Sequence, residues 1–249
     1  MTTVVIVQAR YSSTRLPGKV LFELSGKSVL AHVLERCQAI KNSDLVVCAV
    51  AEGAIHDGVA EEALRTGSTV VRGDVDDVLG RYLQAARAVS ADVIMRVTSD
   101  CPLIDPTVCA RVLDPVLANE ADFAANNMPA TWPHGLDCEA FTRTLLERAA
   151  HEARSDFERE HVSPFMRTAA NVSRVNVTCP EDQGADPSQR WTLDTPQDFE
   201  FMQAVFRHLP AGETGWPYAA AKSVLDAHPE FLTLNSSQDT QDTRMQPKL

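Results

Sequence analysis

The 249-residue chain carries 34 acidic and 23 basic side chains, which give a formal net charge of −11. Its composition, 44% hydrophobic and 23% charged, is that of an ordinary globular protein, and its acidity argues against nucleic acid as the main partner. Since no apolar run approaches the roughly 20 residues that a membrane helix needs, we expect no membrane partner either.

The start of the chain and the cysteines indicate the compartment. In MTTVVIVQAR, Arg10 follows a short apolar run that has no basic residue before it, which predicts a buried strand and not a signal peptide. The six cysteines include no Cys-x-x-Cys pair and lie mostly in apolar segments. We therefore expect buried thiols in a cytoplasmic protein, and neither disulfides nor zinc.

Strands and helices alternate in the first half of the chain. Apolar runs predict strands at residues 3–9, 44–50, 69–73 and 92–100. Helical spacing predicts helices at 29–40 with Ser28 as N-cap, at 58–67 closed by Gly67, and at 76–89. This alternation predicts an α/β fold with three layers, in which a mostly parallel central sheet has helices on both faces.

The alternation weakens beyond about residue 125. Residues 126–141 are loop-rich and lead into a strand, after which we expect helices at about 143–153 and 157–169 and a strand within 171–179. A further helix is expected to start near Pro196. The polar, aperiodic residues 235–249 predict a disordered tail behind a domain of residues 1–234.

A basic loop follows the first predicted strand in VQARYSSTRLPGK, residues 7–19. Residues 1–41 carry a net charge of +4 in a chain that is otherwise acidic. Ligands of open α/β sheets bind where loops leave the carboxyl ends of strands, so Arg10, Arg15 and Lys19 predict a site for a small polyanion such as a nucleoside triphosphate. The loop fits neither a Walker motif, since Ser13 stands where glycine is required, nor Gly-x-Gly-x-x-Gly. A solvated basic loop is the alternative.

Six segments, in order along the chain, resemble one family of enzymes. They are QARYSSTRLPGKVL (8–21), RGDVDDVLGRY (72–82), RVTSDCPLIDP (96–106), HGLDCEAF (134–141), REHVSPF (159–165) and RWTLDTPQDFE (190–200). Together they resemble the cytidylyltransferases that make CMP-activated sugar acids, such as the CMP-Kdo and CMP-acylneuraminate synthetases, and especially the branch named for spore coat polysaccharide biosynthesis protein F.

The resemblance implies a fold, a reaction and a set of partners. The fold is the Rossmann-like nucleotidyltransferase fold, with a dimerisation insertion at about residues 131–174. The reaction is transfer of CMP from CTP to the hydroxyl of a sugar acid of the nonulosonate or octulosonate type, with release of pyrophosphate, for surface polysaccharide or glycoconjugate synthesis. The partners are CTP, the sugar acid, Mg²⁺ and a second copy in a homodimer.

The resemblance also implies roles for residues around the nucleotide. It places Asp100 and Asp194 at the Mg²⁺ ion and makes Lys19, Arg15 and Asp100 the catalytic residues. The nucleotide would be held by Ala9, Arg10, Ser13, Arg15, Lys19, Arg72, Asp74 and Ser99. The chemistry is consistent, because Mg²⁺ prefers one or two carboxylates plus phosphate oxygens and water. Capping of a helix or turn remains the alternative for each aspartate and for Arg72 and Asp74.

The acceptor side is less well matched to the family. The resemblance places His134, Asp137, Glu139 and His161 at the acceptor, with Glu160 nearby. Since a sugar acid needs a positive partner, His134, His161 and Arg159 are the candidates for its carboxylate. Four apolar residues that look exposed support a dimer through residues 131–174. They are Trp132, Leu136, Phe165 and Met166.

Three other functions compete with this one. A sugar-1-phosphate nucleotidyltransferase would use the same fold, but the serine-rich loop differs from the Gly-x-Gly-x-Arg-Leu loop that is typical of those enzymes. A metal-dependent glycosyltransferase would need an Asp-x-Asp motif, for which Asp74-Val75-Asp76 is the candidate, although these acids also suit a helix start. A nucleotide-binding regulator without catalysis is the third.

Overall fold

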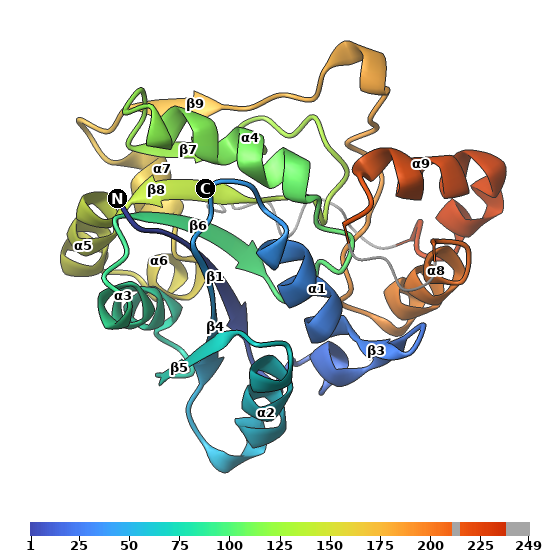
Figure 1. Cartoon of the computed structure of the whole chain (residues 1–249), viewed down its shortest axis with the longest axis horizontal. Coiled ribbons are helices and arrows are strands. Elements are labelled where there is room, and N and C mark those ends of the chain that lie inside the picture. Colours follow the sequence, from blue (N-terminus) through green and yellow to red (C-terminus); the bar gives the residue numbers. More distant parts are fainter. Residues whose placement is uncertain (211–214, 238–249) are drawn as a thin grey trace.

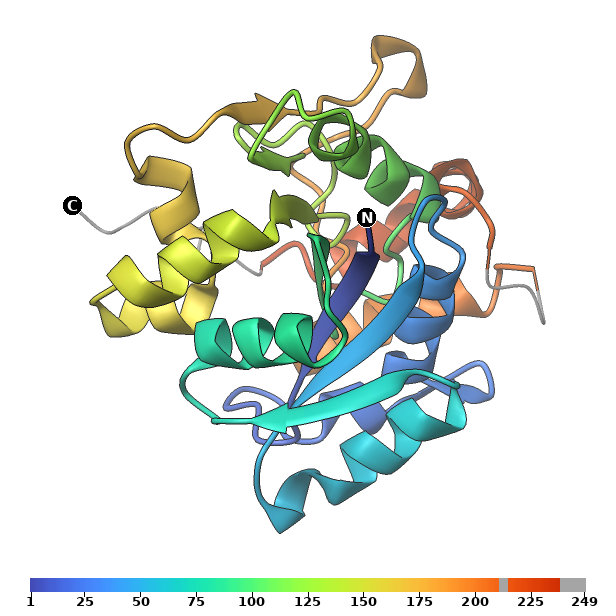
Figure 2. The same ribbon diagram turned by 60° about the vertical axis from the view of Figure 1, so that its left-hand side comes forward.

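The computed structural model describes residues 1–210 and 215–237, and in them a seven-stranded sheet has helices on both faces (Figures 1 and 2). The strand order is β5-β4-β1-β6-β8-β7-β9. The strands are β1 (Thr3–Ala9), β4 (Leu45–Ala51), β5 (Thr69–Gly73), β6 (Val93–Thr98), β7 (Phe123–Ala125), β8 (Glu139–Thr142) and β9 (Arg174–Asn176). A separate two-stranded hairpin joins β2 (Glu23–Leu24) to β3 (Lys27–Ser28).

The sheet is mostly parallel, as the alternation of strands and helices predicts. Strand β1 lies between β4 and β6 and runs parallel to both, and β4 and β5 are also parallel. Strand β8 is antiparallel to both of its neighbours, β6 and β7. Because β1 is covered on both faces, Val4, Val5, Ile6 and Val7 are all fully buried.

Helices cover both faces of the sheet. One face packs against α1 (Val29–Gln38), α2 (Asp57–Arg65) and α4 (Pro106–Leu117). The other face carries α3 (Val78–Ala88), α5 (Arg143–Glu152), α6 (Asp156–His161) and α7 (Pro164–Thr168). Short 3-10 helices are η1 (Lys19–Leu21), η2 (Ala54–His56), η3 (Glu181–Gln183) and η4 (Pro229–Thr233).

A third apolar cluster lies under α8 (Pro196–Phe206) and α9 (Tyr218–Ala227), at the right of Figure 1. Tyr218 has Trp191 and Trp132 against it, each with ring centroids 5.3 Å away. The expectation that Trp132, Leu136 and Met166 are exposed is therefore wrong: each is at most 2% exposed, and Phe165 is partly buried. These residues fill cores of their own chain.

The structure contains elements that the sequence did not predict. Helix α4 has Asp105 as N-cap and Pro106 in its first turn, but Pro115 lies inside it, and an internal proline is normally read as a helix stop. Strand β7 and helix α9 were also not predicted. Both are short, and each depends on a neighbour for its burial.

The helix predicted at 157–169 is interrupted at Val162. This residue has φ +70° and ψ −57°, and the N–H of Ser163 donates to the carbonyl of His161 over 2.8 Å. These values describe a γ-turn with positive φ, which is a strained conformation for a β-branched residue. Full burial of the Val162 side chain stabilises the turn, which separates α6 from α7.

The expected disordered tail starts too early. Asn235 is 3% exposed, and its side-chain amide donates to the carbonyl of Arg190 and to Asp198 Oδ1, both at 3.0 Å. Asn235 therefore belongs to the folded domain, and residues 238–249 of the expected tail are outside the described residues. The six cysteines are free, and five of them are buried. In the described ranges no helix is long and apolar enough to cross a membrane.

Candidate active site

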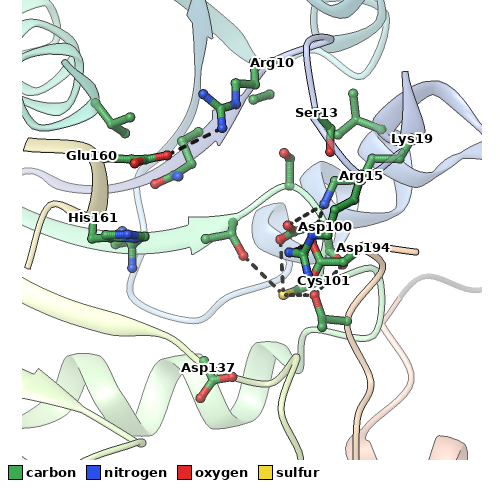
Figure 3. A pocket seen from close by; sticks show the side chains of 18 of the residues that line it. Arg10, Ser13, Arg15, Lys19, Asp100, Cys101, Asp137, Glu160, His161 and Asp194 are labelled. Carbon is green, nitrogen blue, oxygen red and sulfur yellow. Dashed lines mark hydrogen bonds and ion pairs between the residues drawn. The ribbon is translucent and has the colours of Figure 1, made fainter. Parts of the chain in front are cut away.

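A cavity of about 460 Å³ opens at the carboxyl ends of β1 and β6, where open α/β sheets bind their ligands. All but three of the site residues predicted from the sequence line it, and the exceptions are Arg72, Asp74 and Arg159. The predicted residues that line it are Ala9, Arg10, Ser13, Arg15, Lys19, Ser99, Asp100, His134, Asp137, Glu139, Glu160, His161 and Asp194. Figure 3 shows two groups of charged side chains, one around Lys19 and one around His161.

The basic loop after β1 is held in a tight turn. The N–H groups of Ser13 and Gly18 both donate to the carbonyl of Tyr11, and the N–H of Tyr11 donates to His56 Nδ1. Gly18 has φ +73°, and a Cβ at this position would lie 2.8 Å from the Tyr11 ring. Only glycine fits this turn without strain. The next residue, Lys19, begins η1 and enters the cavity, where it is 7% exposed.

Lys19 joins the two carboxylates that were predicted to bind metal. Its Nζ lies 2.8 Å from Asp100 Oδ2, 2.8 Å from Asp194 Oδ1 and 2.7 Å from the carbonyl oxygen of Leu193. Arg15 reaches the same Asp194 oxygen at 3.0 Å from the opposite, exposed side. Residues that lie more than 80 positions apart in the sequence thus meet at one point (Figure 3).

The ion pairs keep this group charged. Burial by itself would raise the pKa of Asp100, but the Lys19 ammonium and hydrogen bonds outweigh burial and hold that pKa well below its usual value. For Lys19, burial would lower the pKa, and the charges of Asp100 and Asp194 reverse the effect and raise it. Lys19 and Asp100 are therefore both ionised throughout the neutral range.

The carboxylates fit a hard divalent cation. Asp100 and Asp194 offer oxygen ligands, and among the described residues no cluster of three or more His, Cys, Asp or Glu side chains could hold a metal by itself. Two carboxylates suit Mg²⁺, which is typically completed by water and substrate phosphate. The Lys19 ammonium lies between oxygens of the two carboxylates.

His134, Asp137 and Glu139, which the sequence assigns to the acceptor, line the cavity together. His134 Nδ1 lies 2.7 Å from Asp137 Oδ2, which also accepts the N–H of Gly135 at 3.0 Å. Gly135 has φ +114°, and a Cβ there would lie 2.2 Å from the carbonyl oxygen of Trp191. The absence of a side chain at Gly135 thus lets this segment pack against the segment that leads to Asp194.

Glu139 is enclosed by protein partners. It is 1% exposed and accepts from Arg96 Nη1 at 2.9 Å and from Ser163 Oγ at 2.8 Å, and Arg167 binds its other side. Burial would raise the pKa of Glu139, but Arg167 and Arg96 lower it. Glu139 therefore lines the cavity as a charged group whose hydrogen bonds are already used.

The surroundings of His161 disfavour the positive charge that the sequence analysis expects of it. It stands at the end of α6, next to Glu160, which pairs with Arg10 at 3.6 Å. Burial is the main cause that lowers the pKa of His161 from 6.5, and Arg96 and Arg10 contribute to the decrease. The imidazole is thus neutral at pH 7, so it is a poor partner for a carboxylate.

The chain matches a known protein family over most of its length. A family model described as cytidylyltransferase matches residues 4–221. The chain belongs to this cytidylyltransferase family, and it is a CTP-dependent nucleotidyltransferase. The spore coat polysaccharide biosynthesis protein SpsF of Bacillus subtilis is 30% identical over 213 residues, which cover 84% of this chain and 87% of the relative.

Solved structures agree with this assignment. A cytidylyltransferase from Leptospira borgpetersenii serovar Hardjo-bovis superposes with a TM-score of 0.87 and 31% identity, covering 96% of this chain and 98% of the other. A CMP:2-keto-3-deoxy-manno-octonic acid synthetase complexed with CTP has the same fold, with a TM-score of 0.62, 19% identity and coverage of 83% of this chain and 99% of the other.

Arg72 and Asp74 lie outside the cavity of this cytidylyltransferase. Arg72 pairs with Asp57 at 2.6 Å. Asp74 Oδ1 accepts the N–H groups of Asp76 and Asp77 at 2.8 and 2.9 Å. The capping alternative describes Asp74 better than contact with nucleotide. Arg159, a candidate for the acceptor carboxylate, instead pairs with Asp77 and also lies outside the cavity.

Several residues of the cytidylyltransferase cavity were not predicted from the sequence. They are Gln8, Thr14, Val20, Val78, Arg81, Arg96, Thr98, Cys101, Asn127 and Thr192. A signal existed for two of them: Gln8 and Arg96 are polar residues inside otherwise apolar strands, in TVVIVQA and VIMRVT. A polar side chain in a strand buried on both faces needs a partner or a ligand.

A buried network holds Asp194 in position. Arg190 Nη2 donates to Asp194 Oδ2 at 2.7 Å, and Arg190 Nε donates to Asp198 Oδ1 at 2.9 Å. Asp198 Oδ2 accepts the backbone N–H groups of Asp194 and Thr195. Asn235 binds the other side of Asp198 at 3.0 Å. Helix α8 and the chain near residue 235 thus fix the carboxylate that faces Lys19.

Loss of this network should destabilise the protein. Asp198→Ala leaves the buried Arg190 with an incomplete set of partners, so we expect a loss of about 3–5 kcal/mol in the free energy of unfolding. Asn235→Ala removes hydrogen bonds only and should cost about 1–3 kcal/mol. Urea unfolding measures both. Ser236→Ala, which removes an exposed hydroxyl, is the control, and an Asn235→Ala variant as stable as this control would contradict the prediction.

Proposed function

We propose that this cytidylyltransferase transfers CMP from CTP to the hydroxyl of a sugar acid of the nonulosonate or octulosonate type, with Mg²⁺ as cofactor. One observation carries the nucleotide part of the proposal: the loop cations Lys19 and Arg15 meet the carboxylates Asp100 and Asp194 within 3.0 Å at the carboxyl edge of the sheet. A site that combines both charges suits a triphosphate with its metal.

The chemistry needs positioning and neutralisation of charge. The acceptor oxygen forms a bond to the α-phosphorus of CTP, the bond from that phosphorus to the pyrophosphate oxygen breaks, and the hydroxyl proton leaves to solvent. Lys19 and Arg15 would neutralise the charge that develops on the departing pyrophosphate. A Mg²⁺ ion held by Asp100 and Asp194 would supply Lewis-acid polarisation of the α-phosphate.

The acceptor class rests on the family resemblance. The sequence segments resemble enzymes that activate sugar acids, and the matching relative of Bacillus subtilis is named for polysaccharide biosynthesis. We extend this to a role in surface polysaccharide or glycoconjugate synthesis in the cytoplasm, where CTP is available.

The test is pyrophosphate release. The purified protein is incubated with each of the four nucleoside triphosphates and with a panel of sugar acids, neutral sugars and sugar 1-phosphates. We expect release with CTP and a sugar acid. Release with a sugar 1-phosphate, and with no sugar acid, would identify the sugar-1-phosphate nucleotidyltransferase. A glycosyltransferase has less support, because the Asp-x-Asp acids begin at Asp74, outside the cavity.

We also propose a homodimer through residues 131–174. Its support is the resemblance to the family, since the apolar residues that suggested an exposed surface are mostly buried. Light scattering at micromolar concentration should give about twice the chain mass of 27.2 kDa. A mass equal to that of one chain would refute the dimer and would leave the catalytic proposal unaffected.

A further inference from the structure

Three buried side-chain atoms of residues that line the cavity have no hydrogen-bond partner among the described residues. They are Gln8 Oε1, Arg81 Nε and Arg96 Nε. Arg81 is 2% exposed and Arg96 is 7% exposed. Buried polar atoms in folded proteins almost always have a partner, and leaving one without costs stability. Three such atoms in one cavity indicate polar groups of a ligand.

The three side chains come together on one face of the sheet. In the register of β1 and β6, Ile6 pairs with Arg96 and Gln8 pairs with Thr98, so Gln8 and Arg96 project from the same face as Ile6. Helix α3 covers this face, because the Tyr82 hydroxyl donates to the carbonyls of Ile6 and Val97. The preceding residue of α3, Arg81, reaches the cavity at this end.

Three arginines, Arg10, Arg81 and Arg96, line the cavity on this face of the sheet. Arg10 pairs with Glu160 and Arg96 pairs with Glu139, whereas Arg81 has no ion pair among the described residues. Glu139 is shared between Arg96 and Arg167, so it does not fully neutralise either arginine. His161 is neutral there. The environment therefore favours an anion, and the donors with no partner are guanidinium N–H groups, which match the oxygens of a carboxylate.

We propose that Arg96, with Arg81 and Gln8, forms the subsite that binds the carboxylate of the acceptor. The inference rests on the proposed function, which supplies an acidic acceptor. Triphosphate has its own partners in Lys19 and Arg15, which belong to the other group of charges in Figure 3. Gln8 contributes through its amide, which can turn to offer an N–H group to a carboxylate oxygen.

Glu139 is then a positioning residue. It holds Arg96 Nη1 at 2.9 Å and thereby fixes the guanidinium plane, and the Nε–H stays free for the acceptor. Arg167 binds Oε1 of Glu139, whereas Arg96 binds Oε2, and Arg167 does not line the cavity. Arg96 and Arg167 are thus two partners of the same acid, and only Arg96 lines the cavity.

This difference supplies a matched pair of variants, Arg96→Gln and Arg167→Gln. Each is assayed with 3-deoxy-octulosonate and N-acetylneuraminate as acceptors, and with the carboxamide of each acid, which has a similar shape and no charge. The wild-type enzyme should prefer the acid that it uses over its amide by at least about tenfold in KM. Arg96→Gln should lose most of this preference while the KM for CTP changes less than about twofold, and Arg167→Gln should keep it. Arg96→Lys should restore part of it.

The outcomes separate this inference from the proposed function. If the wild-type enzyme uses a sugar acid and Arg96→Gln keeps the preference for acid over amide, the subsite is wrong and the function stands. An equal increase in the KM for CTP would instead assign Arg96 to the nucleotide. If the wild-type enzyme uses no sugar acid, both proposals fall. If a thermal melt shows that Arg96→Gln is not folded, Gln8→Glu is the second variant. It should raise the KM for the acid and leave that for the amide unchanged, and equal effects on both would overturn the subsite.

Discussion

Replacing Asp100 or Asp194 by asparagine should lower turnover by more than about a hundredfold. Loss of a residue that only supports a metal ligand costs about 10–100-fold, and loss of the ligand's own charge should exceed that. Asparagine keeps the shape of the side chain, so the variants should fold. A calorimetric titration with Mn²⁺ in the presence of CTP should show weakened metal binding. This measurement does not depend on enzyme activity.

The control for these variants is Asp57→Asn, which changes an exposed acid that pairs with Arg72 outside the cavity. It should retain activity and metal binding. EDTA should inactivate the unmodified enzyme, and an excess of Mg²⁺ should restore it. Full activity of the unmodified enzyme in EDTA, or unchanged Mn²⁺ binding in both asparagine variants, would rule out the proposed metal site.

Lys19→Met should weaken CTP binding by about tenfold or more, because it removes a charge-assisted contact to phosphate. It should also destabilise the protein, because Asp100 and Asp194 lose the ammonium between them. A broken buried pair costs about 3–5 kcal/mol, and we expect less here, since a quarter of the Asp100 side chain is exposed. Binding of CTP by calorimetry and unfolding in urea measure the two effects.

The stability loss of Lys19→Met should depend on pH. In the wild-type protein the pKa of Asp100 is lowered. The Lys19–Asp100 ion pair therefore contributes its full stabilisation at pH values above the pKa of the unfolded chain, which is near 3.8, and this stabilisation is lost only in stronger acid. Without Lys19, burial raises the pKa of Asp100, and the folded protein then binds a proton more readily than the unfolded chain. The stability deficit should therefore shrink as the pH falls from 7 towards 5.

Lys27→Met is the matched control, because Lys27 pairs with Glu35 at the surface. Such exposed pairs contribute about 0–1 kcal/mol. This variant should bind CTP normally, with a small deficit that is similar at both pH values. A Lys19→Met variant that binds CTP as tightly as the wild-type protein, with a deficit independent of pH, would contradict the role assigned to Lys19.

The amino-acid sequence by itself determined the fold class and the centre of the nucleotide site. Predominantly apolar strands such as residues 3–9 are buried on both faces of a parallel sheet, and that pattern is visible in the amino-acid sequence. Asp100 stands at the end of another such run, residues 92–100. Parallel strands end at one edge of their sheet, so the order of elements alone predicts that Asp100 lies near the basic loop.

The sequence could not determine which side chains pair. The sequence alone does not distinguish Arg72, Arg96 and Arg159. In the structure Arg96 lines the cavity, whereas the other two arginines pair with acids outside it. Strand register and the placement of α3 decide this, because a shift of one residue would turn Arg96 to the other face of the sheet. Trp132 shows the same limit, since its burial depends on helix α9, which lies more than 80 residues later.

Only the tertiary structure revealed Lys19 between two carboxylates. Its Nζ contacts Asp194 across 175 positions of sequence. The physical reason is that a charge in a sequence carries no information about its partner, whereas folding removes these groups from water and must then provide each charge with a neighbour. The sequence thus determined that charged residues gather at the carboxyl edge of the sheet, and the packing of distant segments decided which of them face one another and which are left for a ligand.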